Sequence, residues 1–75
     1  MEAVSRVNAE DIRVGDVLAL WCGQKTVVRI EAYRGPLSEI VFAIARYVPS
    51  AGAFAEGGIS LCRGDVFEVL ARGPS

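Results

Sequence analysis

Histidine is missing from this chain of 75 residues, and cysteine is rare, with Cys22 and Cys62 as its two members. Without histidine the chain has no imidazole for general acid or base catalysis and none of the Cys/His spacings of zinc sites. Neither cysteine has a histidine partner to activate it as a nucleophile. We therefore predict no catalytic residue, no bound metal and no cofactor. Both cysteines are expected as free, largely buried thiols in a reducing compartment, with a Cys22–Cys62 disulfide as the alternative.

Neither a surplus of one charge nor a long apolar run is present. Eight basic and nine acidic residues give a formal net charge of −1, and the arginines are interleaved with acids. Surfaces that bind duplex nucleic acid need a basic stripe, so nucleic acid is not an expected partner. No apolar run approaches the roughly 20 residues of a membrane-spanning helix, and residues 1–4 lack the charged and then apolar order of a signal peptide. We predict a cytoplasmic protein without a membrane segment.

What the chain has in excess is apolar side chains, which make up 52% of its residues. A domain of this size buries only about 60–65% of the surface that its unfolded chain exposes. Some apolar side chains must therefore remain outside a single core, and such a surplus usually forms a subunit interface or a ligand groove. We expect a homo-oligomer, with a dimer favoured because closed symmetric assemblies dominate. Scattered exposed apolar residues are the alternative.

Short apolar segments separated by turn residues recur along the chain and predict strands. The segments are residues 4–7, 17–22, 25–33, 59–62 and 66–70. Asn8 is expected to cap a single helical turn after the first of them. Glycine followed by aspartate at 15–16 and 64–65 predicts turns with positive φ, in which Asp16 and Asp65 bond back to the main chain. The adhesion-like Arg-Gly-Asp at 63–65 is interpreted as such a turn.

Segment 25–33 has the clearest alternation of side chains. One predicted face carries Thr26, Val28, Ile30 and Ala32, and the other carries Lys25, Arg29 and Glu31. Segment 38–48 fits both a helix and a strand, and its β-branched and aromatic residues favour the strand. As a strand it places Arg46 in an otherwise apolar row. That guanidinium then needs an ion pair with Glu31, Glu39 or another acid, exposure of its head to water, or an anionic ligand or second subunit.

Residues 49–58 are small and almost uncharged, and they predict a long loop in which residues 51–53 are the most mobile internal segment. The whole pattern predicts a mainly β domain, a small antiparallel SH3-like barrel of five or six strands with one short helix as an option at 38–48. Residues 1–72 are assigned to this single domain and residues 73–75 to a C-terminal tail.

Two runs carry a resemblance to known proteins. Residues 9–18, Ala-Glu-Asp-Ile-Arg-Val-Gly-Asp-Val-Leu, resemble the opening of small SH3-like barrels, and residues 61–70 are similar to their short final strands. This resemblance implies a fold and no particular activity. In size and style the chain also resembles the small proteins of unknown function encoded on mobile integron gene cassettes.

One enzyme family offers a comparison in length and fold. Type II dihydrofolate reductases are SH3-like barrels of similar size that form a tetramer around a shared pore, which a Val-Gln-Ile-Tyr-Pro run lines. Residues 58–62 of this chain, Gly-Ile-Ser-Leu-Cys, lack the glutamine, the tyrosine and the proline of that run. The resemblance therefore does not imply reductase activity here.

Aromatic side chains are the other candidates for an interface or a ligand site. They are Trp21, Phe42, Tyr47 and Phe54, which we interpret with Arg46 as anchors of a contact surface. Our hypothesis is a self-associating binding or adaptor module for a protein or small-molecule partner. The alternative is a small oligomeric enzyme whose active site is assembled at the subunit junction.

Overall fold

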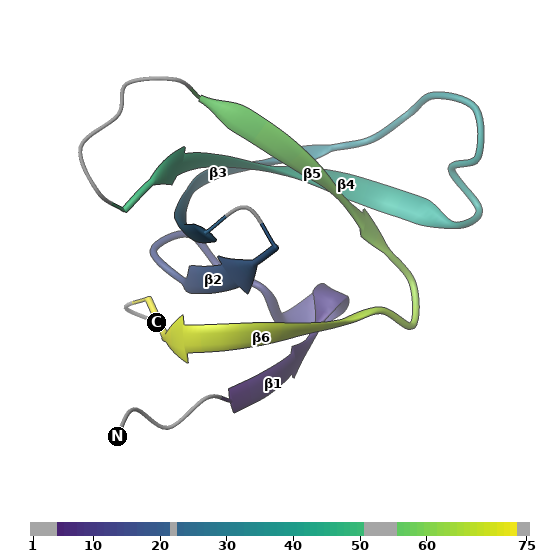
Figure 1. The fold of residues 1–75 in the computed structure, drawn as a ribbon. Coiled ribbons are helices and arrows are strands. Elements are labelled where there is room, and N and C mark those ends of the chain that lie inside the picture. The colour runs from purple at the N-terminus through teal and green to yellow at the C-terminus, as the bar shows by residue number, and fades with distance from the viewer. Residues whose placement is uncertain (1–4, 22, 51–55, 74–75) are drawn as a thin grey trace.

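The computed structural model describes residues 5–21, 23–50 and 56–73. They contain one short 3-10 helix and six strands: β1 (Ser5–Asn8), η1 (Ala9–Asp11), β2 (Val17–Leu20), β3 (Gly23–Ala32), β4 (Val41–Pro49), β5 (Gly57–Cys62) and β6 (Val66–Ala71). All strand pairs are antiparallel, and the sheet has the order β1-β6-β2-β3-β4-β5. Figure 1 shows β3, β4 and β5 crossing above β1, β2 and β6. The prediction of a mainly β domain with five or six antiparallel strands is confirmed.

The sheet is open rather than closed into a barrel. Strands β1 and β5 lie at its two ends, and within the described residues they do not pair with each other. The sheet curls far enough for β5 to contact η1. Short strands and turn signals predict how many strands form, but closure depends on the pairing of distant edges, which those local signals do not report.

The ambiguous segment 38–48 is a strand from Val41 onward. Residues 36–40 form a turn, in which the main-chain N–H groups of Ile40 and Val41 both donate to the carbonyl oxygen of Leu37 at 2.9 Å. Leu37 has a φ of 68°, a left-handed conformation that L residues seldom adopt. The strand alternative is therefore confirmed for most of the segment, and the helix alternative is wrong.

The core lies between the two crossing groups of strands. Its buried apolar members are Val7, Ala9, Ile12, Leu18, Val27, Ala43, Ala45, Leu61 and Val69, with Leu20, Ile30, Phe42, Ile59 and Phe67 packed against them. Burying these side chains stabilises the fold by about 25 cal/mol per Å² of apolar surface. Leu18 is fully buried and lies in β2, between β6 and β3 in the sheet order.

The predicted faces of β3 are wrong around Val28. Val27 is buried at 1% exposure, whereas Val28 is 39% exposed. The register between β3 and β4 shifts between Val27 and Arg29, so the chain has a β-bulge there. A bulge inserts one residue and reverses the alternation beyond it, which is why Val27 and Ile30 both contact the core.

Both Gly-Asp turns form with the predicted positive φ, 94° at Gly15 and 86° at Gly64. Within the described residues the predicted side-chain bond to the main chain is present at Asp16 and absent at Asp65. The main-chain N–H of Asp65 donates to Cys62, which confirms the turn at 63–65. The predicted single helical turn forms as η1 with Asn8 at the N-cap position, but the Asn8 side chain makes no capping hydrogen bond, so that part of the prediction is wrong.

Cys62 is a half-buried free thiol. Cys22 and the predicted mobile segment 51–53 lie outside the described residues.

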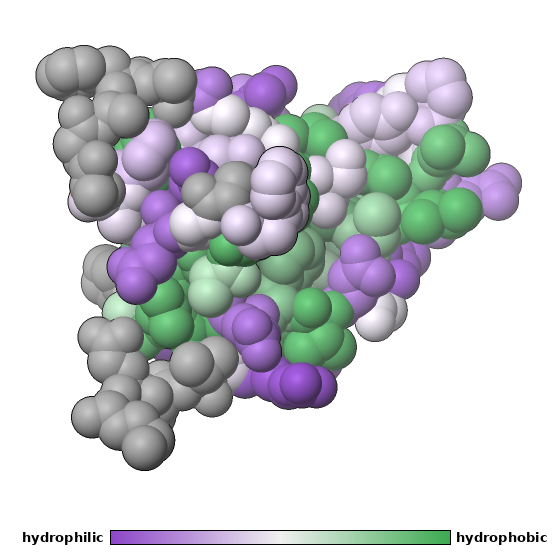
Figure 2. Space-filling model, in the orientation of Figure 1, coloured by the Kyte–Doolittle hydropathy of each residue, from purple (hydrophilic) through white to green (hydrophobic). Residues whose placement is uncertain are grey.

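Several large apolar side chains remain exposed. They are Val14, Trp21, Val28, Leu37, Ile40 and Val66, of which Trp21 is 98% exposed. Figure 2 shows that on the face in view the hydrophobic areas are separate and divided by hydrophilic ones. The apolar surplus is therefore spread on that face rather than gathered into one patch.

Candidate functional site

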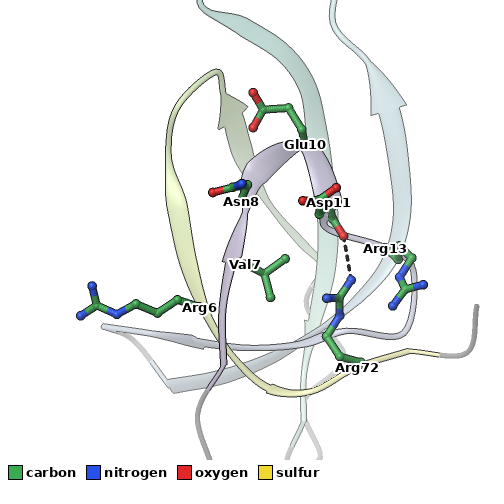
Figure 3. A pocket seen from close by; sticks show the side chains of 7 residues that line it. All are labelled: Arg6, Val7, Asn8, Glu10, Asp11, Arg13 and Arg72. Carbon is green, nitrogen blue, oxygen red and sulfur yellow. Dashed lines mark hydrogen bonds between the residues drawn. The ribbon is translucent and has the colours of Figure 1, made fainter.

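A hollow of about 480 Å³ opens beside β1 and η1 (Figure 3). Its lining consists of Arg6, Val7, Asn8, Glu10, Asp11, Arg13 and Arg72. Three arginines and two acids give this lining a formal charge of +1 in a chain whose net charge is −1. Figure 3 shows Arg6 extending to one side of β1, while Arg13 and Arg72 lie on the other side, close to Asp11.

The buried carboxylate of Asp16 connects the chain segments beside the hollow. It follows the positive-φ residue Gly15 and is fully buried. One carboxylate oxygen accepts the main-chain N–H of Arg13 at 2.9 Å, and the other accepts the main-chain N–H of Gly73 at 2.6 Å and Nε of Arg72 at 3.2 Å. The turn thus bonds back to itself as predicted, and it also fixes the C-terminal segment.

The charge of Asp16 is favoured by these contacts. Burial raises the pKa of its carboxyl, but the hydrogen bonds from Gly73 and Arg13 and the guanidinium of Arg72 outweigh burial, so the pKa lies below its ordinary value. A side chain at position 73 would overlap the main-chain oxygen of Val14, so the close approach of the two segments requires glycine there.

Arg72 is held in one orientation at the wall of the hollow. Its Nε donates to Asp16 and its Nη2 donates to the main-chain oxygen of Asp11 at 2.8 Å. A guanidinium has five N–H donors, so these two contacts leave others free for a ligand. The ion pair with the buried carboxylate and the bond to η1 together preorganise the group.

Arg13 lies beside it without comparable partners. Its Nε is shielded from solvent and has no hydrogen-bond partner within the described residues. A shielded N–H that donates to nothing costs free energy, so most such groups in folded proteins are paired. Glu10 and Asp11 are exposed, and the contact of Arg72 to Asp11 involves the main-chain oxygen rather than the carboxylate. The hollow is therefore lined by one guanidinium held in place and by a second whose Nε has no partner within the described residues.

Arg46 lies elsewhere, on β4, in a network of ion pairs. Its Nε is 3.0 Å from one carboxylate oxygen of Glu31, whose other oxygen is 2.9 Å from Nε of Arg29. Arg29 also reaches Glu56 at 2.9 Å. Hydrogen bonds from Arg29 and then Arg46 lower the pKa of the Glu31 carboxyl. The predicted ion pair of Arg46 with Glu31 is confirmed, and the side chain is 39% exposed, so its charge is not buried.

We predict that Arg46→Met leaves the melting temperature without measurable change. The pair is exposed, screened by salt and redundant, because Glu31 keeps its bond to Arg29. Differential scanning calorimetry measures this directly. If Arg46→Met abolished a ligand-induced rise in melting temperature, or changed the mass of the oligomer, Arg46 would instead belong to a functional surface.

The predicted aromatic residues do not converge on one site. Tyr47 has Lys25 over its ring at 5.8 Å and packs on Gly57, whereas Phe42 has Arg63 over its ring at 5.5 Å and touches the core. Trp21 lies in the turn between β2 and β3, where its side chain is exposed. Phe54 lies outside the described residues.

Sequence reasoning missed Arg13 and Arg72 as members of one site. They are far apart along the chain, and the bonds of Asp16 to both segments, with the bond of Arg72 to Asp11, bring them together. The one local signal was Asp16, which follows a glycine between apolar residues.

Within the described residues, no helix is long and apolar enough to cross a membrane. The same residues contain no group of three or more acidic or cysteine side chains placed to hold a metal ion. Comparison of the chain with known protein families, with curated proteins and with solved structures gives no match.

Proposed function

We propose that this chain is a binding module that holds a carboxylate group of its ligand in the hollow between Arg13 and Arg72. The observation that carries the proposal is the guanidinium of Arg13, whose Nε is shielded and has no partner in the described part of the chain, beside a second guanidinium that Asp16 and Asp11 hold in place. A carboxylate offers two acceptor oxygens in the plane that a guanidinium recognises. The ligand is a small molecule or an acidic group of a partner protein.

The charges around the hollow favour a carboxylate over a phosphate. Asp16 already pairs with Arg72, and Glu10 and Asp11 add two exposed negative charges at the rim. Each carboxylate group carries a charge of −1 and therefore meets less repulsion from these acids than a phosphate group, which carries a larger negative charge on one centre at neutral pH. The same acids disfavour a long polyanion at this hollow.

Succinate should raise the melting temperature of the protein at constant ionic strength. A ligand that binds only the folded state stabilises it by about 1.4 kcal/mol at ten times its Kd, which corresponds to several degrees for a domain of this size. Arg13→Gln should abolish this shift, because it removes one of the two guanidinium groups to which the carboxylate is proposed to bind. Thermal denaturation with succinate, inorganic phosphate and chloride separates the three anions.

The matched control is Arg34→Gln, which removes an exposed arginine that does not line the hollow. It should keep the full response to succinate. A larger shift with phosphate than with succinate would replace carboxylate with phosphate as the ligand group. Equal shifts with all three anions, or an unchanged response in Arg13→Gln, would contradict the proposal.

A further inference from the structure

The two end strands of the sheet differ in how they are protected. β1 has four residues and carries the charged Arg6 and the polar Asn8, both exposed. β5 has six residues, Gly-Gly-Ile-Ser-Leu-Cys, and contains neither a charge nor a proline. Natural end strands are usually short, charged, bulged or interrupted by proline, because their unpaired main-chain groups otherwise pair with another strand. β5 has none of these protections among its own residues.

The second edge of β5 is also unpaired within the described residues. Within the described residues β5 pairs only with β4, so the N–H and C=O groups on its second side have no strand partner. Gly58 and Ser60 are exposed, and Ile59 is partly buried against the core. The shift of register between β4 and β5 falls between Val41 and Ala43, so it does not insert a residue into β5. An extended segment can therefore add to this edge as a further strand.

We propose that the β5 edges of two copies of this chain pair antiparallel about a two-fold axis at Ser60. This pairing joins the two sheets into one and satisfies the free main-chain groups of both copies at once. It opposes Ile59 to the partner's Leu61 on the core side of the sheet, and Ser60 to the partner's Ser60 on the other side, where two hydroxyls can bond. In a continued sheet each side chain stays on its own face, and this register keeps Ile59 and Leu61 of both copies on the core face.

A second copy fits this edge better than a foreign strand for two reasons. The order Ile-Ser-Leu is nearly symmetric about Ser60, so it supplies an apolar partner for each apolar residue when it meets itself in reverse. A two-fold contact is also closed, which limits growth to a dimer and prevents open-ended addition. No residue of β5 lines the hollow, so this proposal does not depend on ligand binding there.

Cysteine cross-linking tests the pairing. In a background without the native thiols (Cys22→Ser and Cys62→Ala), Ser60→Cys places two sulfurs across the two-fold axis. Opposed residues of antiparallel strands have Cα atoms about 4.5–5.5 Å apart, within the roughly 4.4–6.8 Å that a disulfide spans. Mild oxidation at micromolar protein should convert most of the variant to a species of twice the 8.0 kDa chain mass on a non-reducing gel.

The matched control is Ser5→Cys in the same background. Ser5 is an exposed serine on β1, the other end strand, and it should stay monomeric on the gel after the same oxidation. Equal cross-linking of both variants would show random collision and overturn the proposal. The background protein itself must retain the circular dichroism of the wild type, which shows that the fold is kept.

Light scattering behind gel filtration supplies an independent measurement. The wild type should have twice the chain mass, and Ser60→Lys should raise the dimer dissociation constant by at least about tenfold, because like charges then oppose each other. Ser60 is exposed, so this substitution leaves the monomer folded. A wild type that is monomeric throughout the micromolar range, or a dimer that Ser60→Lys does not weaken, would overturn the proposal.

Discussion

Asp16→Asn should lower the free energy of unfolding by about 3 kcal/mol, since hydrogen bonds to a charged group contribute about 1.5 kcal/mol or more each and the carboxylate accepts two from the main chain. An asparagine keeps one acceptor oxygen, but its NH₂ group then faces a main-chain N–H, and two donors cannot bond to each other. The melting temperature should fall by on the order of 15 °C. Urea denaturation at pH 7 measures the change.

The same substitution should remove part of the acid sensitivity of the protein. The pKa of the Asp16 carboxyl in the folded state lies below its ordinary value of 3.8. The stabilisation from its charge is therefore complete above that value and is lost as the pH falls through the lower folded-state pKa. Wild type should lose stability over this range, whereas Asp16→Asn should lose less.

Asp65→Asn is the matched control, because Asp65 also follows a positive-φ glycine but is exposed. Its effect should stay within about 0.5 kcal/mol. If both substitutions cost the same, the bonds from Asp16 to Arg13 and Gly73 are not what stabilises this end of the molecule.

Leu18→Ala should cost about 2–5 kcal/mol, because it removes a fully buried side chain and leaves a cavity. A domain of this size has a total stability of only about 4–11 kcal/mol, so the variant should be partly unfolded or melt far below the wild type. Leu37→Ala removes the same atoms from a side chain that is 69% exposed and should change stability by no more than about 0.5 kcal/mol. Similar losses for the two variants would contradict the assigned core.

Local chemistry explains which features of the fold were predictable. The turn at Gly15 and Asp16 depends on residues within four positions of each other, and both its positive φ and its side-chain bond to Arg13 follow from the sequence. The exposed Val28 was not predictable, because the bulge that exposes it arises from the pairing of β3 with β4. The prediction of a closed barrel was wrong for the same reason, because closure depends on the pairing of distant strands.

The candidate site was less predictable than the fold. Its central contact joins Asp16 to Gly73 across 57 positions of sequence, and no local pattern relates the two. Arg46 was singled out because it interrupts an apolar row, and the structure pairs it with Glu31 as one of the predicted alternatives. Arg13 and Arg72 carried no such signal, since each lies among the usual residues of a turn or a strand end. Self-association and the alternative of an enzyme at a subunit junction stay predictions.

The most direct test of carboxylate binding is the ¹H–¹⁵N resonance of Arg13 Nε during a succinate titration at constant ionic strength. The shielding of this N–H predicts slow exchange with water, so its signal should be visible at neutral pH. The proposal predicts that the Nε–H signals of Arg13 and Arg72 shift together and saturate, while that of Arg34 stays in place. An Arg13 signal that does not move, or arginine signals that all drift in proportion to succinate without saturating, would contradict it.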